Sequence, residues 1–171
     1  MVLPTAAQVS AVMTGANPGF QAFVAMAAFA GLRLGEAAGL QVAEINFLRR
    51  SLDVRRQVQR AGVGAVEVRA PKYGSERLVY LPDSQLEVLA GHIAQHRPSD
   101  DPTRWLFRTT TGPTPHRNTV GHLWRMACQR TGVTGLTLHD LRYCYASGLG
   151  RGPVQRGDCA ASPQPDGQRR P

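Results

Sequence analysis

A histidine and an arginine near the carboxyl end of the chain have the spacing of a phosphate-binding pair. His139 and Arg142 are three positions apart, so a helix would place both side chains on one face. The capping pattern of Thr137 and Asp140 predicts that this helix begins at Thr137 and runs to about Gly148. Both side chains then lie near its amino end, where free N–H groups and the helix dipole attract an anion. The alternative is a solvated pair on an amphipathic helix, because this spacing is common.

The overall charge of the chain favours a polyanion as partner. The 171 residues carry 20 Lys and Arg against 12 Asp and Glu, which gives a formal net charge of +8, and Lys72 is the only lysine. The planar guanidinium of arginine binds phosphate through two parallel hydrogen bonds, although genomic base composition could equally produce the arginine bias. We therefore expect nucleic acid as the partner, ahead of a charge that serves only solubility.

The remaining composition argues against several other classes of protein. Three cysteines without a Cys-x-x-Cys spacing predict no disulfide framework and favour the reducing cytoplasm. The longest apolar run, Ala22 to Leu32, is too short to span a bilayer, so no membrane partner is expected. His92 and His96 have the spacing of two zinc ligands, but no suitable third ligand is near and both are expected to face water. We expect no metal, no other cofactor and no small-molecule substrate.

The hydrophobic periodicity predicts a mainly helical chain with one small sheet. Helical spacing follows the capping residues Thr5, Asn17 and Ser84 and recurs near Asn118. From Ser51 the period changes to two, which predicts a three-stranded antiparallel sheet. Its strands are marked by the pairs Leu52 and Val54, Val66 and Val68, and Leu78 and Tyr80. The expected fold class is therefore α+β, in one domain over residues 1–149.

Two helices of this domain are expected to form the core and a basic surface. The helix after Asn17 has a wide apolar face and is predicted to be the core helix; it ends at Gly31, and Arg33 starts the next helical piece. The helix near Asn118 is basic, with Val120, Leu123, Trp124 and Ala127 expected inside. Three of its arginines are candidates for contact with a DNA backbone, the alternative being a solvated face: Arg117, Arg125 and Arg130.

The last part of the chain differs in composition from the rest. Residues 150–171 are mostly Arg, Gly, Pro, Gln, Ala and Asp, with Val154 as the one sizeable aliphatic side chain. So little apolar surface cannot offset the entropy of ordering the chain, and a disordered tail is therefore predicted. The abrupt change also suggests a hypothesis of translation in a shifted reading frame.

Three segments taken together resemble the tyrosine recombinase, or phage integrase, family. They are Gly31-Leu32-Arg33-Leu34-Gly35-Glu36, then Pro71-Lys72 in a hairpin turn, and then Leu138-His139-Asp140-Leu141-Arg142 followed by Tyr143-Cys144-Tyr145. The resemblance runs in order from about Leu3 to about Leu149. It implies a recombinase-type catalytic domain that lacks its last helices, a role in DNA integration and recombination, and two kinds of partner, double-stranded DNA and other recombinase subunits.

The resemblance also implies roles at the matching positions. Arg33 and Arg142 match the two catalytic arginines, which clamp the scissile phosphate and stabilise the charge of its transition state. Lys72 matches the hairpin lysine, which can donate a proton to the leaving oxygen, and His139 matches the catalytic histidine. Each residue taken singly has an ordinary structural alternative, Lys72 as a solvated turn residue and Arg33 as the ion-pair partner of Glu36.

Two acidic residues are expected to support these groups. Glu36 and Asp140 are acceptors that could orient Arg33 and His139 by hydrogen bonding, a structural role rather than a chemical one.

The nucleophile of the family has no counterpart in this sequence. No tyrosine follows Tyr145, and neither Tyr143 nor Tyr145 is expected to attack phosphorus, because attack requires in-line geometry at near-contact distance. Tyr145 is expected to pack inward. We therefore predict a recombinase fragment that binds DNA and is catalytically defective alone. Two alternatives stay open: a DNA-binding module without chemistry, and a recombinase that receives its tyrosine from a partner in trans.

Overall fold

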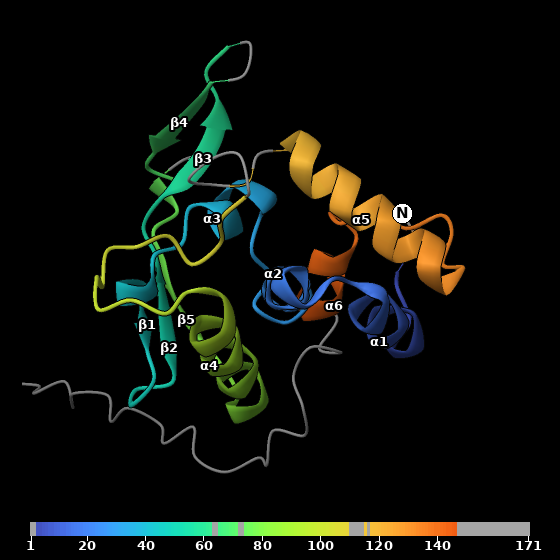
Figure 1. The fold of residues 1–171 in the computed structure, drawn as a ribbon, viewed down its shortest axis with the longest axis horizontal. Helices are drawn as coiled ribbons and strands as arrows, with labels where there is room; N and C mark the ends of the chain where they lie inside the picture. Colours follow the sequence, from blue (N-terminus) through green and yellow to red (C-terminus); the bar gives the residue numbers. More distant parts are fainter. Residues whose placement is uncertain (1–2, 63–64, 72–73, 110–114, 116, 147–171) are drawn as a thin grey trace, which may run out of the picture.

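The strands gather on one side of the molecule and most of the helices on the other (Figure 1). The computed structural model describes residues 3–62, 65–71, 74–109, 115 and 117–146. The helices are α1 (Ala6–Gly15), α2 (Pro18–Phe29), α3 (Leu34–Ala38), the 3-10 helix η1 (Val42–Glu44), α4 (Asp83–His96), α5 (Arg117–Thr131) and α6 (Leu141–Ala146). The strands are β1 (Ile45–Asn46), β2 (Ser51–Val54), β3 (Gln57–Arg60), β4 (Val66–Arg69) and β5 (Arg77–Tyr80). The predicted α+β class is confirmed.

Helix α2 forms the centre of the helical side, as the sequence predicts. Phe20 and every residue of 22–28 are buried, and the helix packs against α1, α3, α4 and α6. Phe23 contacts the ring of Phe20 at a centroid distance of 5.5 Å and that of Phe107 edge-on at 5.0 Å. A helix with apolar side chains on nearly all sides is stable only when other elements surround it, and α2 is so enclosed.

The starts of the first two helices follow the predicted caps only in part. Thr5 and Gln8 form a reciprocal capping box at α1: the Gln8 N–H donates to Thr5 Oγ1 at 3.2 Å, and the Thr5 N–H to Gln8 Oε1 at 2.9 Å. Asn17 stands at the N-cap of α2 but makes no capping bond with its side chain. Its Oδ1 instead accepts a hydrogen bond from Nη1 of Arg130 at 2.6 Å, which joins the end of α5 to the α1–α2 connection.

The strands pair differently from the prediction. The three-stranded antiparallel sheet has the order β1-β2-β5, and the segment with Val66 and Val68 pairs instead with β3 in a separate two-stranded sheet. The predicted pattern did not contain β3, because Gln57 and Gln59 interrupt its apolar alternation. Gln57 is nevertheless buried, and its amide Nε2 donates to the carbonyl of Ala70 at 2.8 Å.

The pair that marks β5 in the sequence pattern, Leu78 and Tyr80, does not face the core. Val79 is buried, whereas Leu78 is 49% and Tyr80 73% exposed. The register pairs Val79 with the fully buried Leu52, and this pairing fixes which face of β5 meets the core. Arg77, two positions before Val79, therefore lies on the same side of the strand as the core.

Helix α4 corrects two expectations. It begins at Asp83 after an N-cap at Pro82, so Ser84 lies inside the helix and is not its cap. His92 is buried rather than facing water, and its Nε2 lies 3.0 Å from the carbonyl oxygen of Leu106. A carbonyl can only accept, so Nε2 carries the proton and Nδ1 is left without a hydrogen-bond partner among the described residues. No group of three His, Cys, Asp or Glu that could hold a metal is found within those residues either.

Helices α5 and α6 complete the core around α2. Val120, Trp124 and Ala127 of α5 are buried as predicted. Thr137 and Asp140 form the expected reciprocal bonds, but they close a turn, and regular helix begins only at Leu141.

Gly31 allows α6 to approach the end of α2. It has the left-handed φ of 63°, and a Cβ at this position would lie 2.8 Å from Cδ1 of Tyr145. Tyr145 therefore packs inward, as expected.

Some expectations fall on residues outside those that the structure describes. These are Lys72, the end of the last helix near Gly148, and the tail over 150–171. Within the described part of the chain, no helix combines the length and the apolar character that crossing a membrane requires.

The buried His92 predicts a pH dependence of stability. Burial lowers its pKa in the folded state, so the unfolded chain takes up a proton first as the pH falls through about 6.5, and folding becomes less favourable. We expect wild-type protein to lose more stability between about pH 7.5 and 5 than His92→Gln, which does not titrate there and can still donate to the Leu106 carbonyl. Urea unfolding at both pH values measures this. His122→Gln, at an exposed histidine of α5, is the control and should follow wild type; equal losses in all three proteins would contradict the prediction.

The approach of α6 to Gly31 predicts an unusually costly glycine substitution. Gly132 also has a left-handed φ, of 68°, but a Cβ there would have no other atom within 4 Å, so Gly132→Ala tests backbone strain alone, about 1 kcal/mol. Gly31→Ala adds a clash with Tyr145 and should cost about 1–3 kcal/mol more in the free energy of unfolding. Equal destabilisation of the two variants in urea would show that the contact with Tyr145 carries no energy.

Candidate phosphate-binding site

The carboxylate of Glu36 forms the centre of the candidate site. Its side chain is only 1% exposed and accepts four hydrogen bonds. Arg33 supplies two, from its backbone N–H to Oε2 at 2.9 Å and from Nη1 to Oε1 at 2.8 Å. Arg77 supplies the others, from Nη2 to Oε2 at 2.8 Å and from Nη1 to Oε1 at 3.2 Å. Burial alone would raise the pKa of Glu36, but the hydrogen bonds from Arg77 and Arg33 outweigh it and bring the pKa down to about 2.

Arg33 is placed by the short helix that it precedes. It is the N-cap residue of α3, and the bond from its backbone N–H to the Glu36 side chain satisfies one of the free donors at the helix start. Its side chain is 41% exposed, and within the described residues its guanidinium makes a single hydrogen bond. Most of its N–H donors are therefore unused by the part of the chain that the structure describes.

Arg142 reaches the same place from α6. Its Nε donates to the carbonyl of Gly31 at 2.9 Å, two residues before Arg33. Burial lowers the pKa of Arg142, and the positive charges of Arg33 and Arg77 lower it further while Glu36 opposes them. No hydrogen bond of its terminal Nη groups is seen in the described part of the chain. The structure thus brings Arg142 to the same place as Arg33 and Glu36, although it comes from the opposite end of the sequence.

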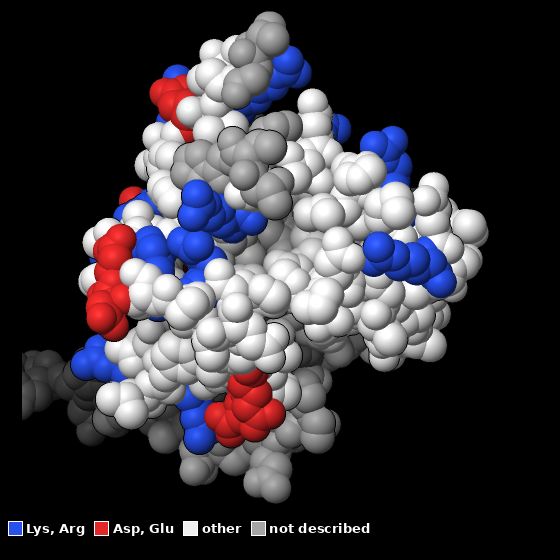
Figure 2. All heavy atoms as spheres, viewed as in Figure 1, with Lys and Arg blue, Asp and Glu red and all other residues white. Residues whose placement is uncertain are grey.

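Arg77 belongs to this cluster and was not anticipated. The sequence pattern marks this strand by Leu78 and Tyr80 and gives Arg77 no role. The correct phase, with Val79 inward, would have placed it next to the core. We call Arg33, Arg77, Arg142 and Glu36 the arginine cluster: three positive charges and one negative charge, an excess of two positive charges that suits an anion. Figure 2 shows basic side chains gathered over α3 and the neighbouring strand ends, with others on α5.

His139 lies beside the arginine cluster in sequence, but its contacts are different. It is exposed, in the turn before α6, and its ring meets Tyr143 edge-on at a centroid distance of 5.9 Å. Asp140 bonds to Thr137, from the backbone N–H at 2.8 Å and from the hydroxyl at 2.7 Å. These bonds, led by the hydroxyl, lower the pKa of Asp140. Asp140 therefore holds the turn that carries His139, and no bond between the two side chains is seen among the described residues.

The three basic residues of α5 do not behave alike. Arg117 and Arg125 are exposed on the helix surface. Arg130 is also exposed, but its Nη1 donates to the carbonyl of Gly15 at 3.2 Å as well as to Asn17. Arg130 thus has a structural contact of its own.

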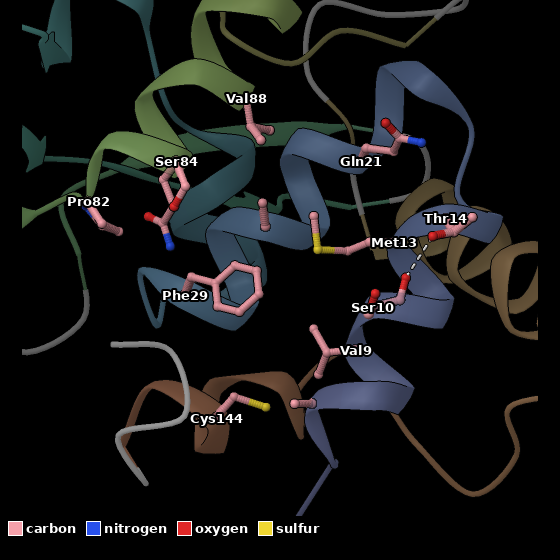
Figure 3. Close-up of a pocket in the computed structure, with 13 residues that line it drawn as sticks. Val9, Ser10, Met13, Thr14, Gln21, Phe29, Pro82, Ser84, Val88 and Cys144 are labelled. Atoms are coloured by element: carbon pink, nitrogen blue, oxygen red, sulfur yellow. Dashed lines mark hydrogen bonds between the residues drawn. The ribbon is translucent and has the colours of Figure 1, made fainter. Parts of the chain in front are cut away.

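A separate hollow of about 570 Å³ lies among α1, α2, α4 and α6 (Figure 3). Its walls are mainly apolar, with Val9, Met13 and Phe29 pointing into it. The buried amide of Gln85 in its wall has no hydrogen-bond partner among the described residues. No residue of the arginine cluster lines this hollow, so it is distinct from the candidate site.

Comparisons with solved structures agree with this fold. The integrase of the transposon Tn1549, solved in complex with a circular intermediate DNA, superposes with a TM-score of 0.73 at 17% identity, over 86% of this chain and 52% of that one. The XerA recombinase gives 0.71 at 19% identity, over 92% and 51%. The integrase from mycobacterium phage Brujita gives 0.59 at 20% identity, over 87% and 45%. The chain thus spans about half the length of these proteins, and at such identities the likeness concerns the fold.

Sequence comparison gives the family itself. No curated protein matches the chain. The sequence profile described as the phage integrase family matches residues 5–154, most of the chain and all four members of the arginine cluster. With the recombinase fold and three arginines gathered around Glu36, the chain belongs to the phage integrase family of tyrosine recombinases.

Proposed function

We propose that this chain binds double-stranded DNA and holds one backbone phosphate between Arg33 and Arg142. The observation that carries the proposal is the state of these two side chains. Each guanidinium is fixed by one hydrogen bond, to Glu36 and to the Gly31 carbonyl, and each keeps its other N–H groups unused among the described residues. Two arginines so arranged can bind the non-bridging oxygens of a phosphodiester without first breaking contacts within the protein.

Electrostatics support the same proposal. Burial and neighbouring positive charge disfavour the charged form of Arg142 in the free protein. An anion placed beside it would relieve this repulsion, so binding has a driving force beyond its hydrogen bonds. The net charge of +8 adds a long-range attraction to DNA, and the Tn1549 integrase that shares this fold was solved with DNA bound.

The remaining candidate residues are assigned roles around this phosphate. His139 and Lys72 are proposed to complete the set of phosphate-handling groups that the family resemblance implies. Arg117 and Arg125, exposed on α5, are proposed to contact neighbouring backbone phosphates. Such contacts position a duplex but do not read its sequence, so binding is expected to be largely independent of base sequence.

We further propose that the 171-residue chain does not cleave DNA by itself. Tyr143 is engaged with the ring of His139, and Tyr145 packs on Gly31. Neither arrangement suits in-line attack on a phosphate held by Arg33 and Arg142, which requires near-contact of about 3–3.5 Å with aligned orbitals. Strand cleavage would then depend on a tyrosine outside these 171 residues, such as one supplied by a partner subunit.

The proposed site predicts how DNA binding responds to salt. Affinity for a short fluorescent duplex, measured by anisotropy, should fall steeply between about 50 and 200 mM salt. Arg33→Gln and Arg142→Gln should each weaken binding about tenfold and lower the slope of log affinity against log salt by about one, because each removes a phosphate contact.

Arg50→Gln is the matched control for this experiment. Arg50 is an exposed arginine that pairs with Asp83 at 3.1 Å, outside the arginine cluster. The control variant should bind DNA as wild type does. Wild-type binding by both cluster variants at every salt concentration would rule out Arg33 and Arg142 as the phosphate site.

The proposal that neither Tyr143 nor Tyr145 attacks DNA predicts that these 171 residues form no covalent product. Incubated with a pool of nicked duplexes that trap any cleaved intermediate, the chain should give no protein–DNA adduct that survives detergent. A tyrosine recombinase that keeps its nucleophile, treated with its own nicked site, serves as the positive control. An adduct that disappears in Tyr143→Phe or Tyr145→Phe would show that α6 itself carries the nucleophile.

A further inference from the structure

We infer that Arg77 is a positioning residue for the phosphate site: by binding both oxygens of Glu36, it keeps the Arg33 guanidinium free to face a phosphate. This inference rests on the proposed function and deepens it. Arg77 lies 41 positions from Glu36 in sequence and comes from β5, so it connects the sheet to α3 through a single ion pair.

The hydrogen bonds of Arg77 differ from those of Arg33 and Arg142, which indicates a different role. Both terminal nitrogens of Arg77 donate to Glu36, and its Nη1 also lies 3.4 Å from the carbonyl oxygen of Ser75. Arg77 is thus engaged within the protein at the end that would otherwise meet a ligand. Arg33 and Arg142 make one side-chain bond each among the described residues, so they keep donors for an anion.

Arg77 also limits the number of hydrogen bonds that Glu36 can accept from the Arg33 side chain. A carboxylate and a guanidinium prefer a two-bond, side-by-side arrangement when both are free to turn. Glu36 already accepts two bonds from Arg77 and one from the Arg33 backbone, so only one position remains for the Arg33 side chain. Without Arg77, the carboxylate could turn and engage both terminal nitrogens of Arg33, which would remove its phosphate-binding end.

Glu44 provides a comparison within the same chain. Like Glu36, it is buried and accepts from the backbone N–H three residues before it, that of Gln41, at 2.8 Å. Its only arginine contact seen in the described residues is Arg56 Nη2 at 3.4 Å, and its Oε1 has no hydrogen-bond partner there. Glu44 thus shows that a buried carboxylate at the start of a short helix can lack an arginine that binds both of its oxygens. Of these two carboxylates, only Glu36 accepts hydrogen bonds from both terminal nitrogens of one arginine, Arg77.

The test uses the 171-residue chain and Arg77→Lys, which keeps the charge but replaces the planar fork by a point donor. Binding to the same short duplex should weaken about tenfold, as expected when a charged hydrogen bond to the phosphate is lost. The salt slope should fall by about one, as for Arg33→Gln. Arg50→Lys, the same change in the exposed pair with Asp83, should leave both values unchanged.

The decisive readout is the double variant Arg77→Lys with Arg33→Gln. If Arg77 acts only through Arg33, the double variant binds no more weakly than Arg33→Gln alone. Multiplied losses would mean that Arg77 contacts DNA itself, and wild-type binding by Arg77→Lys would mean that it positions nothing; either result overturns the inference. Failure of the proposed function looks different, because Arg33→Gln would then bind DNA as wild type does.

A second pair of variants covers the case in which Arg77→Lys does not fold. Removing both charges together, as Arg77→Leu with Glu36→Gln, avoids leaving a buried carboxylate without its partner. Urea unfolding confirms that this protein is folded. Because this variant also lacks the Glu36 carboxylate that would otherwise engage both terminal nitrogens of Arg33, it should bind DNA about as tightly as wild type. Binding weakened about tenfold would show that Arg77 contacts DNA itself and would overturn the inference.

Discussion

The buried carboxylate of Glu36 is the constraint on which the rest of the site depends. A charge removed from water is tolerated only when hydrogen bonds and opposite charge replace its hydration, so Glu36 requires both Arg33 and Arg77. These two arginines come from the start of α3 and the start of β5. The Arg77–Glu36 ion pair therefore fixes the short helix α3 against the three-stranded sheet, with which it has few other contacts.

The remaining geometry follows from the connection between α2 and α3. Gly31 turns the chain in a conformation that other residues adopt only with strain, and its carbonyl then faces Arg142. The same glycine leaves room for Tyr145, so α6 lies close enough to bring its arginine to the cluster. One short segment of chain thus determines the positions of Arg33 and Arg142 together, although 111 positions of sequence separate Gly31 from Arg142.

Local sequence signals were sufficient where the interaction itself is local. The capping box of Thr5, the core helix α2 and the position of Arg33 at a helix start could all be predicted, because each depends on residues within one or two turns. Strand pairing is not local. The phase of β5 depends on its register with β2, which the apolar pattern of β5 alone does not give. Arg77 was missed for that reason, and the burial of His92 because the carbonyl that makes it tolerable comes from Leu106, outside α4.

The low pKa of Glu36 has a consequence for the conditions under which the site keeps its charge. With a folded-state pKa lowered to about 2, this carboxylate stays ionised in mildly acidic, neutral and alkaline solution. A moderate change of pH therefore does not neutralise Glu36 or remove its ion pairs with Arg33 and Arg77. Strong acid protonates this carboxylate in the unfolded chain at a higher pH than in the folded chain, so it disfavours folding. The ion pairs, and with them the binding of an anion, would therefore be lost when the protein unfolds.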